Sequence, residues 1–223
     1  MKRIYLYTVV LLLSALMITP LAQVSSAASP EVEVRHTIIA ASGSAAPGGG
    51  TYTPLFFNAT VNASHQVAFD AFLSGAPATT GVFVGDGMTT STIALGGNPN
   101  PPSFGNVFNP FITPRAVNDH GVISYFAFLS GTTATQAIFR TDGTKTVAIA
   151  CDDTAPPTGG TFAALFNPVM NDRGQVAFKS EMTGGSADNG IFQGKGGALT
   201  PVFVTNQIVP RGSHNPGRRH SSN

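Results

Sequence analysis

Cysteine, tryptophan and charged residues are all scarce in this chain of 223 residues. Cys151 is the only cysteine, so no disulfide can form within the chain, and packing must hold the fold together. We expect Cys151 to be a small buried residue, because a catalytic thiol needs a positioned histidine and the nearest in sequence, His120, lies in another predicted turn. Tryptophan is absent. Charged residues make up only 10% of the chain, which leaves little material for a charged binding face.

The long apolar run at the N-terminus has the composition of a secretory signal peptide. Lys2 and Arg3 precede an apolar stretch from Ile4 to Ile18, Pro20 interrupts it, and small residues follow at 25–28. The run is shorter than the ~20 residues that a spanning helix needs. We therefore predict a signal peptide at 1–28, a secreted or cell-surface protein, and no membrane span after cleavage.

Basic residues are too few to suggest a nucleic-acid partner. Without Lys2 and Arg3, 10 basic residues stand against 11 acidic ones. This balance provides no basic face for a phosphate backbone. Residues 209–223 are polar and predict a disordered tail.

The chain contains a threefold repeat instead. The octapeptides NASHQVAF, NDHGVISY and NDRGQVAF begin at Asn62, Asn118 and Asn171. Each is followed by a strand-like segment with a central aromatic, a Gly-bearing turn, a short apolar stretch and a Gly/Pro-rich linker. With 25 glycines and 16 prolines, this pattern predicts an all-β protein with many tight turns.

Each repeat predicts about four short antiparallel strands, the size of a propeller blade. We place the repeats at about 41–95, 96–150 and 151–205 in one domain at 29–208, preceded by a single strand at 34–40. That strand would be the last of an incomplete unit. Three blades are too few to close a propeller, so we expect a partial or open propeller-like array. A three-sheet β-prism or a sandwich is the alternative, and a homo-oligomer is the candidate for closing the array by pairing three-unit halves.

Alternate residues in the strand after each octapeptide predict a buried face. The expected repeat-core residues are Val67, Phe69, Phe83, Ile123, Tyr125, Phe139, Val176, Phe178 and Phe192. The second repeat is also apolar on its other face. Either both of its faces are covered, or Phe126 and Phe128 mark a contact surface.

The octapeptides predict structural turns. Asparagine can bond the backbone two residues on, and glycine at the fourth position suits a positive φ. The expected turn residues are Asn62, His65, Asn118, Gly121, Asn171 and Gly174. His65 stands where the other repeats have glycine, so its turn is either strained or of another type.

The alternative for these turns is an oxygen-rich cation or sugar site. Such a site would add Asp119, Asp172 and Asp142 to the asparagines. Calcium needs six to eight oxygen ligands, and the turn of the first repeat offers no carboxylate. We expect no cofactor, with calcium as the alternative.

The octapeptide NDRGQVAF, with the neighbouring segments GIF and APPTGGTF, resembles the repeat of exported bacterial "choice-of-anchor" proteins, whose motif is N-x-x-G-x-x-A/V-F. The resemblance covers about Val34 to Val204 and departs from the motif at His65 and at Ser124-Tyr125. It implies a secreted or surface-displayed, β-rich bacterial protein and assigns no activity.

The sequence contains no G-x-S-x-G, H-E-x-x-H or P-loop motif and no Cys/His metal spacing. We name no catalytic or metal residue and expect a structural or binding role without catalysis. Cell-surface glycans or proteins are the candidate partners. The alternatives are a glycan- or ester-active enzyme on a propeller-like scaffold and a fragment of a longer repeat protein.

Overall fold

The computed structural model describes residues 34–98, 106–131 and 133–206. The predicted signal peptide at 1–28 and the predicted tail at 209–223 lie outside these residues. Among the described residues, no helix is long and apolar enough to cross a membrane.

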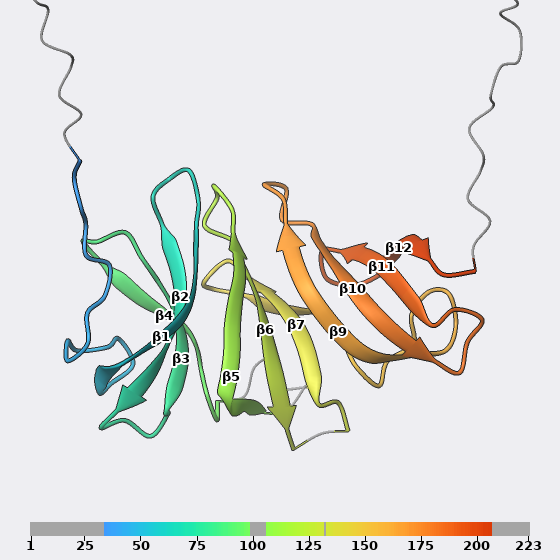
Figure 1. Ribbon diagram of the computed structural model, residues 1–223, viewed down its shortest axis with the longest axis horizontal. Coiled ribbons are helices and arrows are strands. Elements are labelled where there is room, and N and C mark those ends of the chain that lie inside the picture. Colours follow the sequence, from blue (N-terminus) through green and yellow to red (C-terminus); the bar gives the residue numbers. More distant parts are fainter. Residues whose placement is uncertain (1–33, 99–105, 132, 207–223) are drawn as a thin grey trace, which may run out of the picture. The chain divides into compact units, whose positions relative to one another are not determined.

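Three four-stranded antiparallel sheets follow one another in chain order (Figure 1). The first contains β1 (Thr51–Val61), β2 (Val67–Ser74), β3 (Thr80–Gly85) and β4 (Thr90–Leu95). The second contains β5 (Asn106–Val117), β6 (Ile123–Ser130), β7 (Gln136–Thr141) and β8 (Thr146–Cys151). The third contains β9 (Thr161–Met170), β10 (Val176–Thr183), β11 (Asn189–Gly194) and β12 (Thr200–Val204). The predicted fold class is confirmed: the described chain is all-β, in tandem antiparallel four-stranded units.

The first strand of each sheet is longer than the sequence pattern suggested, because β-bulges let it bend and continue pairing. The ladder between β1 and β2 shifts register on both sides of Phe56, and similar shifts occur in the other two sheets. The pairings also define equivalent positions. Phe56 lies opposite Ala71, Ile112 opposite Ala127, and Leu165 opposite Ser180.

The sheets pack face to face. The face that each sheet turns toward the preceding repeat, which we call the front face, carries Phe69 and Phe83, Tyr125 and Phe139, or Phe178 and Phe192. The opposite back face carries Val82, Ile138 or Ile191 at one equivalent position. Val82 shares a core with Tyr125, and Ile138 shares one with Phe178. Each internal seam therefore joins the back face of one sheet to the front face of the next.

Residues 34–40, predicted as a strand, form no strand in the structure. In the described structure no strand lies beside this segment to form a ladder with it. Its last residues nevertheless lie where β8 lies relative to the third sheet. The linker that follows them, before β1, folds like the linker before β9: Ser44 Oγ donates to Ala41 O at 2.7 Å, and Thr154 Oγ1 donates to Cys151 O at 2.6 Å. Ile39 packs on the front face of the first sheet, as Ile149 of β8 packs on that of the third.

Candidate functional site

All three octapeptide turns have the same internal geometry. The side-chain oxygen of the asparagine accepts a hydrogen bond from the backbone four residues on: Gln66 N to Asn62 at 2.8 Å, Val122 N to Asn118 at 2.9 Å, and Gln175 N to Asn171 at 3.0 Å. The fourth residues have φ values of 62° at His65, 74° at Gly121 and 71° at Gly174. His65 thus adopts the same left-handed conformation as the glycines, in which a Cβ is unfavourable.

The asparagines also connect successive repeats. Asn62 Nδ2 donates to the carbonyl of Asn118 at 2.7 Å, and Asn118 Nδ2 donates to the carbonyls of Asn171 at 3.3 Å and Asp172 at 3.1 Å. Asn171 ends this ladder, with its Nδ2 directed to Gln175 Oε1. The turns therefore stack on one another across both seams, a contact that the octapeptide pattern alone did not predict.

The turn carboxylates are occupied as hydrogen-bond acceptors. Asp119 accepts from the backbone of Ala63 at 2.7 Å, and Asp142 accepts from the backbone of Thr144 and Lys145 at 3.0 and 2.8 Å. These bonds hold the pKa of Asp142 at about 2. In the described part of the chain, no three His, Cys, Asp or Glu side chains gather in a way that could hold a metal ion. Calcium binding stays a prediction.

The repeat-core residues lie on the front faces. All of them are buried except Val67, which is partly buried. Phe126 packs against the core of the third repeat and meets Phe128 edge-on, with ring centroids 5.2 Å apart. The structure therefore places Phe126 in a seam between repeats rather than on an open surface.

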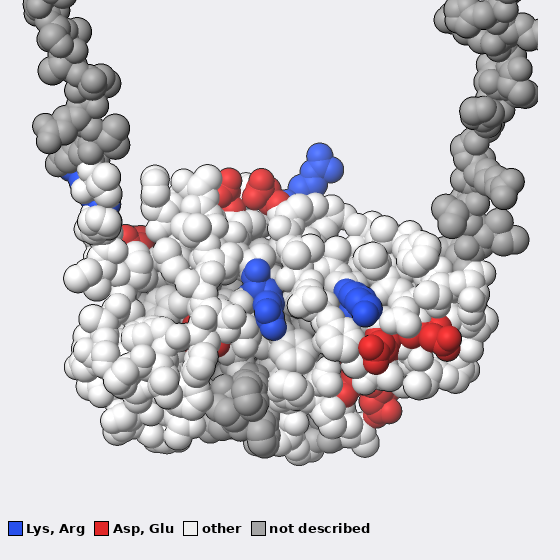
Figure 2. Space-filling model, viewed as in Figure 1, with Lys and Arg blue, Asp and Glu red and all other residues white. Residues whose placement is uncertain are grey.

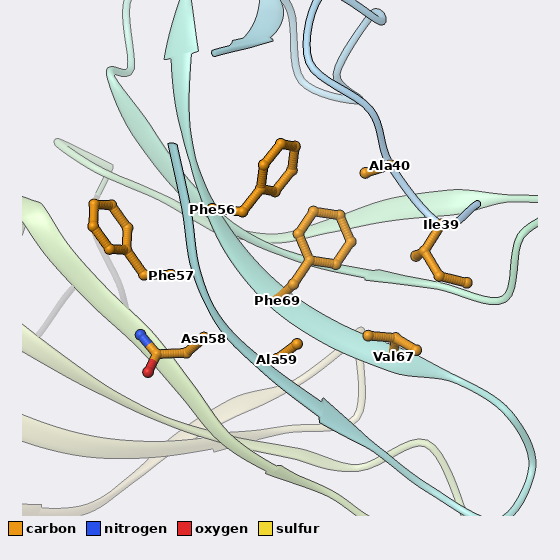
Figure 3. A pocket seen from close by; sticks show the side chains of 8 residues that line it. All are labelled: Ile39, Ala40, Phe56, Phe57, Asn58, Ala59, Val67 and Phe69. Carbon is orange, nitrogen blue, oxygen red and sulfur yellow. The ribbon is translucent and has the colours of Figure 1, made fainter. Parts of the chain in front are cut away.

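The front face of the first sheet is the one front face that no preceding sheet covers in the described structure. Phe56 is 38% exposed, whereas the equivalent Ile112 and Leu165 are 1% and 2% exposed. Phe56 and Phe69 lie side by side, with their ring centroids 6.0 Å apart, and line a pocket of about 220 Å³ together with Ile39 and Val67 (Figure 3). A shallow apolar pocket of this kind is typical of an interaction surface.

The opposite end of the array has a matching feature. Val82 and Ile138, on the back faces of the first two sheets, are fully buried in the seams, whereas the equivalent Ile191 is 42% exposed. Phe203 is exposed as well, while its equivalents Ala94 and Ala150 are buried. In the described structure, the two ends of the array are therefore unpaired halves of the same kind of seam.

Burial shifts the pKa values of Asp70 and Cys151. Burial raises the pKa of Asp70, a carboxylate on the back of β2, although hydrogen bonds from Asn58 N at 2.6 Å and Asn58 Nδ2 at 3.2 Å oppose the shift. Burial, with the charge of Asp152, raises the pKa of Cys151 to about 12. This thiol is buried, as expected from the sequence, and has little thiolate character at neutral pH.

Comparison with known proteins identifies a family and no characterised relative. No curated protein matches the chain. No solved structure matches it either. A family model described as a family of unknown function, DUF7453, matches residues 22–218. Because this match covers most of the chain, the protein belongs to the DUF7453 family.

Proposed function

We propose that this is an exported β-repeat protein with a structural role, built by association of copies through the two ends of the array. The back face of the third sheet of one copy would cover the front face of the first sheet of the next. Export rests on the N-terminal sequence, and bacterial origin rests on the resemblance to choice-of-anchor repeats; both stay predictions.

The observation that carries the proposal is the exposure at equivalent positions. Phe56 and Ile191 are exposed at the ends, whereas the residues that replace them inside the array are almost fully buried. Burying a large apolar side chain contributes about 1.5–3 kcal/mol. A second copy supplies the surface that each end lacks, in the geometry that both internal seams already use.

Two features of the ends bear on how copies fit. Lys179 and Glu181 are exposed on the back of β10. The equivalent of Lys179 in the first seam is Asp70, which is only 8% exposed, so a seam tolerates a charged side chain at this position.

The segment Thr37–Ala40 lies against the first sheet where the fourth strand of a preceding sheet would lie. In a seam between copies, β12 of the other copy is that fourth strand, so the two segments would compete for one position. Thr200–Phe203 of β12 are all exposed, and Pro201 has no N–H for the ladder. We expect β12 to give way, so that Thr37–Ala40 of one copy pairs with β11 of the other.

Cross-linking tests the association. We expect the double variant Phe56→Cys/Ile191→Cys of the full chain to form disulfide-linked dimers or longer chains under mild oxidation, since Ile138 and Leu165 at equivalent positions share one core. A closed ring of two copies gives dimers alone, and an open filament gives a ladder of sizes. Cys151 is buried and stays out of these links.

The matched control pairs Phe56→Cys with Met88→Cys, which lies in the turn between β3 and β4 and is 89% exposed. The control should not cross-link above the level of the single variants. Equal cross-linking by both pairs, or a monomer at every concentration in light scattering, would refute association through the ends.

A further inference from the structure

Basic residues are few on this protein, yet several of them share one cavity. Charged side chains are sparse on the face shown in Figure 2. The described chain contains seven basic residues: Arg35, Arg115, Arg140, Lys145, Arg173, Lys179 and Lys195. Arg140, Lys145 and Lys195 line a cavity of about 290 Å³ between the β7–β8 hairpin and the β11–β12 hairpin.

The repeat shows that the positive charge of this cavity is specific to the second seam. Lys195 occupies the turn position held by Asp86 in the first repeat and Asp142 in the second, as the flanking ladder pairs show. Arg140 likewise stands where the first repeat has Val84 and the third has Gln193. Both changes add positive charge at the same seam, and the first seam has no basic residue at either position.

The nearby acid offsets only part of this positive charge, since one carboxylate stands against three cations. Asp142 is the one carboxylate in the cavity lining, and its Oδ1 accepts bonds from Thr144 and from the backbone of Lys145. Arg140 Nε is buried without a hydrogen-bond partner in the described structure. A buried donor of this kind is unfavourable when it is left unpaired, so a ligand oxygen that accepts from it would be stabilised.

Glycines shape the walls around these side chains. A Cβ on Gly174, the octapeptide glycine, would lie 2.9 Å from Arg140 Nε, so this glycine makes room for the guanidinium. A Cβ on Gly196 would lie 3.0 Å from Val147 Cγ2, so the loop that carries Lys195 can approach β8 closely. The two hairpins thereby bring one guanidinium and two ammonium groups to a single opening.

We propose that this cavity binds the carboxylate or sulfate group of an acidic sugar. A guanidinium offers a planar pair of donors that suits an oxyanion, and ammonium groups add charge at any angle. The volume lies just below the usual range for small-molecule sites, which suits one sugar residue rather than a long chain. This site would act independently of how copies associate.

The test uses the full chain and titrations at constant ionic strength. The probes are a sulfated disaccharide, a galacturonate disaccharide, sodium sulfate and a neutral disaccharide. Calorimetry measures the binding of each probe. We expect the acidic sugars to bind and the neutral one not to bind. Sulfate that binds as tightly as the sugars would identify a free oxyanion as the ligand and would overturn the assignment to a sugar.

Variants separate a built site from general electrostatic attraction. Lys195→Asp restores the residue of the other two repeats and should fold normally, yet it should weaken binding of the acidic sugar at least about tenfold. Lys179→Asp makes the same charge change on β10, outside the cavity lining, and should leave the affinity unchanged. Equal losses in both variants, or no binding of any acidic probe, would overturn the proposal.

Discussion

The asparagine ladder predicts that Asn118 stabilises the fold more than either of its counterparts. Asn118 is 4% exposed, and its side chain bonds in two directions. Its Oδ1 accepts from Val122 N within its own turn, and its Nδ2 reaches the carbonyls of Asn171 and Asp172 in the next repeat. Replacing it with alanine therefore removes a turn cap and a contact between repeats together.

The magnitude follows from these bonds. Loss of a cap costs about 1 kcal/mol, and a buried N–H left without a partner costs about 1–3 kcal/mol. We expect Asn118→Ala to lower the free energy of unfolding by about 2–4 kcal/mol. Asn171 is exposed and its side chain bonds only within its own turn, so Asn171→Ala should cost about 1 kcal/mol.

Urea unfolding followed by far-UV circular dichroism measures this difference, since the chain has no tryptophan for fluorescence. Asn62→Ala, which loses one inter-repeat bond, should fall between the other two variants. A cost at Asn171 equal to or greater than that at Asn118 would show that the ladder between repeats does not contribute to stability.

Two further predictions concern single positions in the first repeat. His65→Gly removes a Cβ from a residue in the left-handed conformation. It should raise the free energy of unfolding by about 0.5–1 kcal/mol in the same urea assay. A loss of stability would show that the histidine side chain contributes more than its backbone strain costs. For Asp70, burial disfavours the charged form in the folded state, so its contribution to stability should rise as pH falls through its raised pKa and level off below the usual value near 3.8. Thermal unfolding across this window should show the rise in the wild type and a smaller rise in Asp70→Asn, and identical profiles would contradict the assignment.

The sequence predicted what each repeat does alone. Alternation along β2, β6 and β10 identified the front-face residues, because period-2 patterning reports which side of a strand is buried. The Asn and Gly positions identified the turns, because their backbone preferences are local. Both kinds of signal are contained within about ten residues of chain.

The sequence did not predict what depends on neighbouring repeats. The segment 34–40 has the composition of a strand, yet strand formation requires a partner edge, and the described residues provide none for this segment. The rungs from Asn62 to Asn118 and from Asn118 to Asn171 depend on how turns stack across a seam. The basic cavity was also missed, because Arg140 and Lys195 lie far apart in sequence and only the aligned repeats show that both depart from the pattern.

The three repeats differ from one another more on their back faces than on their front faces. At one back-face position the three repeats carry Asp70, Phe126 and Lys179, while the front faces repeat an aromatic pair. Phe126 packs against the third sheet, whereas Lys179 is exposed, with its ammonium 5.3 Å from the Phe166 ring. The front face is thus constrained by the fold common to all repeats, and the back face by whatever covers it. The residues that distinguish one repeat from another are therefore where a partner or ligand of this protein should be sought.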